Sequence, residues 1–184
     1  MGETLMNNTK IYSSMVEVAE LGNPILQAQA KRVLSFVEGE GLAHIVAQMR
    51  EVMQERNGVG IAAPQIGISQ QILIIASRPN ARYPEAPLIE PVVMINPIIG
   101  ATSSQTEKGW EGCLSVPGIR GYVSRAVQVS VDFVDVNGVS QHWDLEGFPA
   151  RIFLHEYDHL IGLTFLDRID SVADLVSENE LAKR

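Results

Sequence analysis

Two histidines four residues apart give this sequence its clearest chemical feature. The segment His155-Glu156-Tyr157-Asp158-His159 reads His-Glu-x-x-His, in a stretch whose pattern is typical of a helix. A helix turns by about 100° per residue, so His155 and His159 share one face and can bind one metal ion. Glu156 lies one step round the helix, where its carboxylate can reach a water molecule on that ion. Metal-assisted hydrolysis of an amide requires these groups.

The alternative is an amphipathic helix with two ordinary histidines and an exposed glutamate. The chain has four histidines, His44, His142, His155 and His159, and half of them fall in this pentapeptide. We therefore favour a metal site. We interpret His44 as a surface residue of an earlier helix.

A catalytic site of the zinc type has three protein ligands and an open position for water, and this helix supplies only two. The only cysteine, Cys113, lies in the segment Glu111-Gly112-Cys113-Leu114-Ser115, which we expect to be a loop or an edge strand. The alternative for a lone cysteine is a small buried apolar side chain. The helix site lacks one ligand, and the Cys113 thiol has no second cysteine to pair with, so Cys113 is the natural third ligand. We predict a site of Cys113, His155 and His159 with one open corner.

A third segment, residues 58–65, reads Gly-Val-Gly-Ile-Ala-Ala-Pro-Gln and has almost no side-chain bulk. Such a backbone can approach a ligand or another strand closely, although a tight loop packed on the core is the simpler interpretation of this segment alone. Gln65 is the one residue in it that can donate a side-chain hydrogen bond. It is not a phosphate-binding loop, because no Lys-Ser/Thr pair follows.

Length and composition restrict the class of protein. The 184 residues, 46% apolar and 20% charged, are ordinary for one soluble domain, which we expect over 1–184 with residues 1–20 and 171–184 peripheral. The net charge of −8 and the lack of a basic run argue against nucleic-acid binding. No apolar run is long enough for a membrane span, and residues 1–20 lack a secretion or transit signal. A single cysteine excludes an internal disulfide and fits a reducing compartment.

Apolar periodicity predicts a helix from Gly41 that ends at Asn57-Gly58. Its apolar stripe consists of Leu42, Ile45, Val46, Met49, Val52 and Met53. Strands are expected over residues 71–76, 92–95, 126–136 and 139–145. Connections are expected over residues 78–91, at Asn96-Pro97 and, as a hairpin, at Asn137-Gly138.

The second helix is expected to contain the histidines. Pro149 suits its first turn and Gly162 its end. The polar segment 101–108 is expected to be a connection or an edge strand, and residues 171–184 a short tail or a frayed helix.

Taken in order, segments 58–65, 111–115 and 155–159 resemble the three motifs of the peptide deformylase family, in its bacterial type 1-like form. The resemblance runs from about Gly22 to Ile169. Ile61 stands where leucine is commonest in the family, and no expected metal ligand is missing. The short C-terminal tail is similar to the bacterial type that lacks a long added helix.

The resemblance implies an α+β fold in which antiparallel sheets pack around a central metal-binding helix. It implies removal of the N-formyl group from the N-terminal formyl-methionine of new polypeptides, with release of formate. It implies one divalent ion per chain, Fe²⁺ natively, with Zn²⁺ or Ni²⁺ in some preparations. The implied partners are N-formyl-methionyl peptides and a transient contact with the ribosome, without nucleic acid or membrane. The bacterial cytoplasm is the expected setting, and an organelle stays open.

The expected reaction uses metal-bound water as nucleophile, with Glu156 as general base and then general acid. The resemblance implies that the side-chain amide of Gln65 and the backbone N–H of Leu114 stabilise the oxyanion together with the metal. It also implies that Asp158, behind the site, pairs with Arg125.

By the same resemblance, the residues that bind substrate are Val59, Gly60, Arg120, Phe148 and Ile152. Valine, phenylalanine and isoleucine are also ordinary core residues. Ile152 precedes His155 by three positions and so shares its helix face, which favours a place beside the site.

The sequence leaves two alternatives to a deformylase open. A metallopeptidase of the His-Glu-x-x-His class would share the helix but would not need Cys113. A deformylase-like protein whose metal is structural or lost would not be an enzyme, and the presence of Glu156 argues against it.

Overall fold

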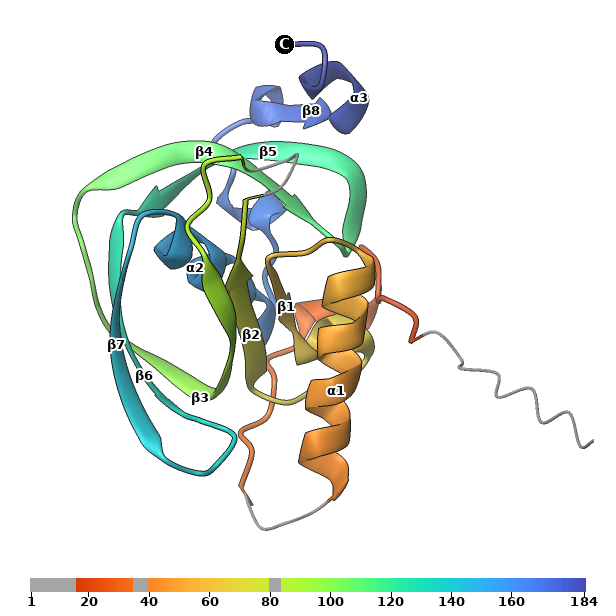
Figure 1. Ribbon diagram of the computed structural model, residues 1–184. Helices are drawn as coiled ribbons and strands as arrows, with labels where there is room; N and C mark the ends of the chain where they lie inside the picture. Colours follow the sequence, from red (N-terminus) through yellow and green to blue (C-terminus); the bar gives the residue numbers. More distant parts are fainter. Residues whose placement is uncertain (1–15, 35–39, 80–83) are drawn as a thin grey trace, which may run out of the picture.

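The computed structural model describes residues 16–34, 40–79 and 84–184 of the chain (Figure 1). The described part consists of two antiparallel sheets, with helix α2 (Phe148–Leu160) in contact with strands of both. The α+β class and the central position of the histidine helix are thereby confirmed.

The larger sheet has five strands in the order β1-β2-β3-β6-β7. Its strands are β1 (Gly60–Ala62), β2 (Ile72–Ser77), β3 (Ile89–Thr102), β6 (Gln128–Val134) and β7 (Ser140–Glu146). The smaller sheet has the order β4-β5-β8 and consists of β4 (Thr106–Cys113), β5 (Val116–Ala126) and β8 (Leu175–Ser177). The remaining elements are α1 (Glu40–Glu55), α3 (Glu178–Leu181) and the 3₁₀ turns η1 (Pro24–Gln27), η2 (Ala63–Ile66), η3 (Phe165–Arg168) and η4 (Val172–Asp174).

Strand β2 separates the two main apolar clusters because its side chains alternate between the faces of the sheet. Leu73 and Ile75 pack with the α2 side chains Ile152 and Phe153, whereas Ile72 and Ile74 join the cluster that contains α1 residues. The larger sheet is therefore covered on both faces. This burial holds α2, and the histidines on it, at a fixed place.

Local sequence signals define both ends of α2. Pro149 lies in its first turn, and Gly162, just past its end, has a left-handed φ of 79°. Helix α1 ends similarly, with Asn57 at φ 52°. His44 is exposed on α1. The predicted hairpin is also confirmed, since β6 and β7 pair across the turn that contains Asn137 and Gly138.

The predicted turn at Asn96-Pro97 is wrong, because β3 continues through it to Thr102. Asn96 adopts φ 50°, and the register with β6 shifts between Ile95 and Ile98. A bulge of this kind accommodates a proline, which has no N–H for the ladder. The Asn96 side chain bonds both the N–H and the carbonyl of Val33, which fixes the irregular backbone.

The C-terminal segment is more ordered than a tail. Residues 175–177 form β8, which pairs with β5 through Ile119↔Ser177 and Gly121↔Leu175, and α3 follows directly. The predicted frayed helix is present only as α3, whereas the three-residue strand Leu175-Val176-Ser177 was not predicted, because its stability comes from pairing with a distant partner. Segment 101–108 divides between the end of β3 and the start of β4, and β4 is an edge strand as one of the two expectations had it.

The first described residues also reach the centre of the molecule. Ala19 donates its N–H to the carbonyl of Gln65, and Leu21 donates to the carbonyl of Ser115. Residues 1–15, 35–39 and 80–83, with the parts of the predicted N-terminal, connecting and loop segments that fall there, lie outside the described residues. Among the described helices, none is both long and apolar enough to cross a membrane.

Candidate active site

The three predicted metal ligands converge between α2 and the end of β4. One donor atom from each of Cys113, His155 and His159 lies within 4.8 Å of the other two. The Sγ of Cys113 is 3.2 Å from Nε2 of His159. Ligand atoms on a tetrahedral Zn²⁺-type ion are about 3.5 Å apart, given metal–ligand bonds of about 2.0–2.3 Å. The donor set and its spacing therefore fit one divalent ion.

Glu111, which was not predicted to have a role, orients the first histidine. Its Oε2 lies 2.9 Å from Nδ1 of His155, and this leaves Nε2 of that ring as the metal-binding atom. Such a carboxylate fixes both the tautomer and the orientation of a ligand. Glu111 precedes Cys113 by two positions in β4, so alternation places both side chains on one face of the strand. That spacing was the available signal in the sequence.

Two arginines hold Glu111 in place. Arg125 donates from Nε and Nη2 to both carboxylate oxygens, each at 2.9 Å, and Arg151 of α2 donates to Oε1 at 2.8 Å. Burial would raise the pKa of Glu111, but the hydrogen bonds from His155 and Arg125 lower that pKa to about 2. Glu111 is therefore charged at any pH at which the protein would act.

The same arginine connects the site to Asp158, as predicted. Nη1 of Arg125 lies 2.6 Å from Oδ2 of Asp158. Arg168 binds the other side of this carboxylate, with Nη2 at 2.6 Å from Oδ1. The pKa of Arg125 is raised, since its two carboxylate partners outweigh burial. A row of alternating charges thus runs from the surface to His155.

Burial and charge also set the state of the ligands themselves. Burial would raise the pKa of the Cys113 thiol, but the charge of His159 and hydrogen bonds from both imidazoles hold it well below its usual value. The thiolate in turn raises the pKa of His155 against the effect of burial. A thiolate is the form of cysteine that binds metal, and a metal ion would displace the imidazole proton.

Glu156 faces the cleft without a counter-charge of its own. Within the described part of the chain, its Oε2 is buried and has no hydrogen-bond partner. Burial raises the pKa of Glu156 to about 7, and the charges of His155 and His159 only partly offset this. Gly60 makes room for this side chain, since a Cβ there would lie 2.5 Å from Oε1 of Glu156. Residue 60 must therefore be a glycine, because the Glu156 carboxylate occupies the place where a Cβ would lie.

Gln65 is oriented by its own segment. Its Oε1 accepts the N–H of Ala62 at 2.8 Å, so its amide nitrogen must point the other way. That nitrogen lies 3.4 Å from Sγ of Cys113 and 3.3 Å from Oγ of Ser115. The simpler interpretation of segment 58–65 as a tight loop is wrong, because Gly60–Ala62 form strand β1, paired with β2, and Ala63–Ile66 form the turn η2. The apolar residues of these two elements are packed in the core, as that interpretation expected, whereas Gln65 faces the metal ligands.

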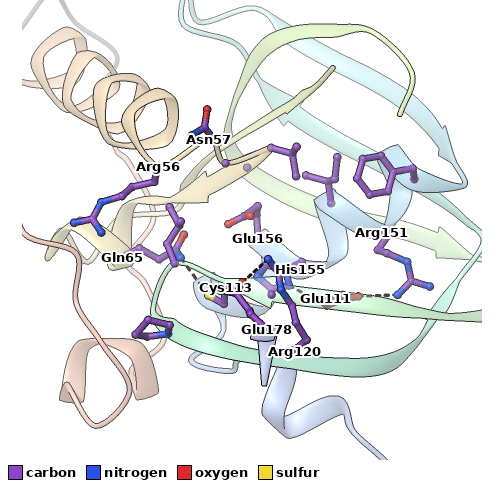
Figure 2. Close-up of a pocket in the computed structure, with 18 of the residues that line it drawn as sticks. Arg56, Asn57, Gln65, Glu111, Cys113, Arg120, Arg151, His155, Glu156 and Glu178 are labelled. Carbon is purple, nitrogen blue, oxygen red and sulfur yellow. Dashed lines mark hydrogen bonds and ion pairs between the residues drawn. The ribbon is translucent and has the colours of Figure 1, made fainter. Parts of the chain in front are cut away.

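All five residues expected to bind substrate line one cleft, which opens beside the metal ligands (Figure 2). They are Val59, Gly60, Arg120, Phe148 and Ile152, and Leu114 lines the same cleft. Further lining residues that were not predicted include Arg56, Arg151 and, from the C-terminal segment, Glu178. An apolar wall from Val59, Phe148 and Ile152 therefore lies next to a rim of charged side chains.

A half-buried thiol and two buried imidazoles beside the Glu156 carboxylate, held between antiparallel sheets, define a metal-dependent hydrolase. Comparison with known proteins agrees. The family model of polypeptide deformylase matches residues 15–174. The chain belongs to this family, whose members remove the N-formyl group from new polypeptides.

Individual relatives extend over almost the whole chain. Peptide deformylase 2 of Nostoc sp. is 43% identical over 166 residues, covering 90% of this chain and 92% of that protein. Peptide deformylase 2 of Shewanella oneidensis is 49% identical over 151 residues, covering 82% of each. The Met-Ala-Ser-bound crystal structure of class I type b peptide deformylase from Acinetobacter baumannii superposes with a TM-score of 0.83 at 47% identity, covering 85% of this chain and 99% of that one.

Proposed function

We propose that this chain hydrolyses the formyl amide of N-terminal formyl-methionine, with Cys113, His155 and His159 as metal ligands and Glu156 as the proton-transferring group. The observation that carries the proposal is the position of Glu156. Its buried carboxylate, whose Oε2 has no hydrogen-bond partner among the described residues, lies one residue from a metal ligand and faces the cleft. A structural metal site has no use for such a group, because burying an unpaired carboxylate is costly.

A divalent ion held by these three residues would polarise the formyl oxygen and lower the pKa of a water molecule bound to it. We propose Fe²⁺ as the native ion, with Zn²⁺ or Ni²⁺ able to replace it. The ligand set of one thiolate and two imidazoles suits all three ions, so availability in the cell decides which one is bound.

Glu156 is placed to move the proton. Its pKa of about 7 lies near neutral pH, where a group can both accept and return a proton efficiently. It would take a proton from the attacking water and later deliver it to the leaving amine of methionine. A bound ion would add positive charge and lower this pKa from its value in the metal-free site, which would favour the basic form in the resting enzyme.

Gln65 and Leu114 would stabilise the developing oxyanion. The amide nitrogen of Gln65 is already directed at the ligand cluster by the Ala62 bond, so little reorganisation is needed during the reaction. Leu114 follows Cys113 directly in the turn between β4 and β5, which brings its backbone N–H next to the metal ligands.

The apolar wall of Val59, Phe148 and Ile152 would receive the methionine side chain, and Gly60 and Arg120 would lie along the peptide backbone. The relative from Acinetobacter baumannii was crystallised with Met-Ala-Ser, which has the sequence of a product peptide. We propose that new polypeptides meet the enzyme in the bacterial cytoplasm, in transient contact with the ribosome. The net charge of −8 opposes lasting association with RNA.

Formate release from formyl-Met-Ala-Ser by anaerobically purified protein tests the proposal, together with the metal content of each preparation. We expect formate in proportion to bound metal, and no metal in Cys113→Ser. A metallopeptidase would instead cleave between residues of the peptide, and a protein with a structural metal would do neither.

The variant Gln65→Leu tests the oxyanion role separately. It should keep its metal and its fold but lose about 10²–10³-fold in kcat, which is typical for removal of one such donor. Unchanged turnover would remove Gln65 from the mechanism.

A further inference from the structure

In the cleft, an ion pair joins the proposed substrate-binding residue Arg120 to the C-terminal segment, for which the hydrolysis gives no role. Nη2 of Arg120, on β5, lies 2.6 Å from Oε1 of Glu178, the first residue of α3. Figure 2 shows the two side chains together, next to Cys113 and His155. The two partners differ in exposure, since the side chain of Arg120 is 6% exposed and that of Glu178 is 42% exposed. The carboxylate is therefore the partner that a peptide in the cleft meets first.

Local structure fixes both members of the pair. The guanidinium of Arg120 lies against Gly112, where any Cβ would clash with it. Strand β8 pairs with β5 at Arg120↔Val176 and Ile119↔Ser177, one residue before Glu178. The C-terminal segment thus delivers its carboxylate to Arg120 through a strand hydrogen-bonded to the same stretch of β5.

A buried guanidinium in a substrate cleft is a strong binding group for a carboxylate. Burying such a guanidinium without a counter-charge destabilises the fold. Glu178 supplies that counter-charge from within the chain. Because it is tethered by a short strand, its effective concentration is of the order of millimolar or higher. An acidic side chain of a substrate would have to displace Glu178 and would also be repelled by it.

We propose that Glu178 is a specificity-determining residue: it occupies the carboxylate site at Arg120 and so disfavours substrates with an acidic residue after the formyl-methionine. This inference rests on the proposed hydrolysis of formyl-methionyl peptides. It assigns to the C-terminal segment a part in substrate choice, in addition to its place in the smaller sheet.

Matched peptides test the proposal. One pair of substrates is amidated formyl-Met-Ala-Glu and formyl-Met-Ala-Gln. A second amidated pair has Glu or Gln in the second position, directly after formyl-methionine. Amidation removes the terminal carboxylate, so only the side-chain charge differs. The measured quantity is the ratio of kcat/KM for the Glu peptide to that for the Gln peptide. In Glu178→Gln we expect this ratio to rise about tenfold at one of the two positions, as expected for a gained charge-assisted hydrogen bond.

Control variants separate the role from a general effect on α3. Glu180 lies on the same helix, pairs with Lys183 at 2.6 Å and does not line the cleft, so Glu180→Gln should keep the wild-type ratio. The double variant Arg120→Gln/Glu178→Gln should lose the gain, since the guanidinium is then absent. Each ratio is taken within one variant, so a change in the folded fraction cancels. If Glu178→Gln is insoluble, Glu178→Asp, with its shorter reach, should give an intermediate ratio.

An unchanged ratio at both positions in Glu178→Gln, or an equal rise in Glu180→Gln, would overturn the inference while formate is still released. Absence of formate from every peptide with wild-type protein would overturn the proposed function, and this inference with it.

Discussion

Two histidine–carboxylate pairs in this chain have nearly the same geometry and very different surroundings. Nδ1 of His155, on α2, lies 2.9 Å from Oε2 of Glu111, on β4, and the His155 side chain is 9% exposed. On the β6–β7 hairpin, Nδ1 of His142 lies 2.7 Å from Oδ1 of Asp132, and the His142 side chain is 57% exposed. Distance alone therefore does not distinguish a functional pair from a surface pair.

The difference lies in what else each pair contacts. Glu111 also binds Arg125 and Arg151, while His155 faces Cys113 and lines the cleft. Among the described residues, the further contacts of His142 are weak, with its Nε2 3.5 Å from Ser130 Oγ and 3.8 Å from Asp144 Oδ1. Burial makes each charge depend on its partner, whereas water can replace the partner at the surface. The following predictions test this contrast.

The largest effect is expected from removing each imidazole in turn. His155→Ala should lose its bound metal and at least about a thousandfold in formate release, because the ion supplies several kcal/mol of transition-state stabilisation. His142→Ala should retain both metal and activity. Elemental analysis and initial rates on the two purified variants check this, and equal losses in both would contradict the contrast.

Neutralising Glu111 should lower the free energy of unfolding much more than neutralising Asp132. Glu111→Gln leaves the buried Arg125 without one of its two charged partners, which should cost about 3–5 kcal/mol in the free energy of unfolding. The same variant should bind metal about 10–100-fold more weakly. Asp132→Asn, which breaks an exposed pair, should shift the urea midpoint far less. A Glu111→Gln protein as stable as wild type would show that the arginine pairs do not support the fold.

Arg168 lies at the exposed end of the charge row and should give an intermediate result. Its guanidinium binds both oxygens of the buried Asp158 but is itself half exposed, so water can compensate much of its loss. Arg168→Gln should therefore lower the free energy of unfolding by about 0.5–1 kcal/mol. Chemical denaturation at low and high salt measures this, and a loss as large as that of Glu111→Gln would contradict it.

The smallest effect is a titration at the surface pair. The hydrogen bond to Asp132 raises the pKa of His142 above its usual value. Because the folded-state pKa is the raised one, the pair's contribution to stability is complete below about pH 6.5 and is lost as pH rises through the folded-state pKa. NMR titration of the His142 ring should show the raised pKa in wild type and its return toward about 6.5 in Asp132→Asn. An identical pKa in both proteins would exclude Asp132 as the cause.

The parts of the site that follow from local rules could be predicted from the sequence. The four-residue spacing of His155 and His159 places them on one helix face whatever surrounds the helix. Pro149 and Gly162 limit that helix because their allowed φ values act within single residues. Asn137-Gly138 defines its hairpin for the same reason.

Other features depend on segments that meet only in the folded chain. The spacing of Glu111 from Cys113 places it near the metal ligands, but its partners Arg125, Arg151 and His155 are all distant along the chain. Likewise, nothing local to Asn96-Pro97 indicates the Val33 contact that lets β3 continue. Strand β8 has only three residues, too few for a periodic pattern to be recognised without its partner β5, and Glu178 reaches Arg120 only through that pairing. The sequence by itself determined which groups could bind metal and transfer a proton, since these depend on residue type and short spacing. The tertiary structure decided which charges support them and which enter the cleft, because buried ion pairs join residues that are distant along the chain.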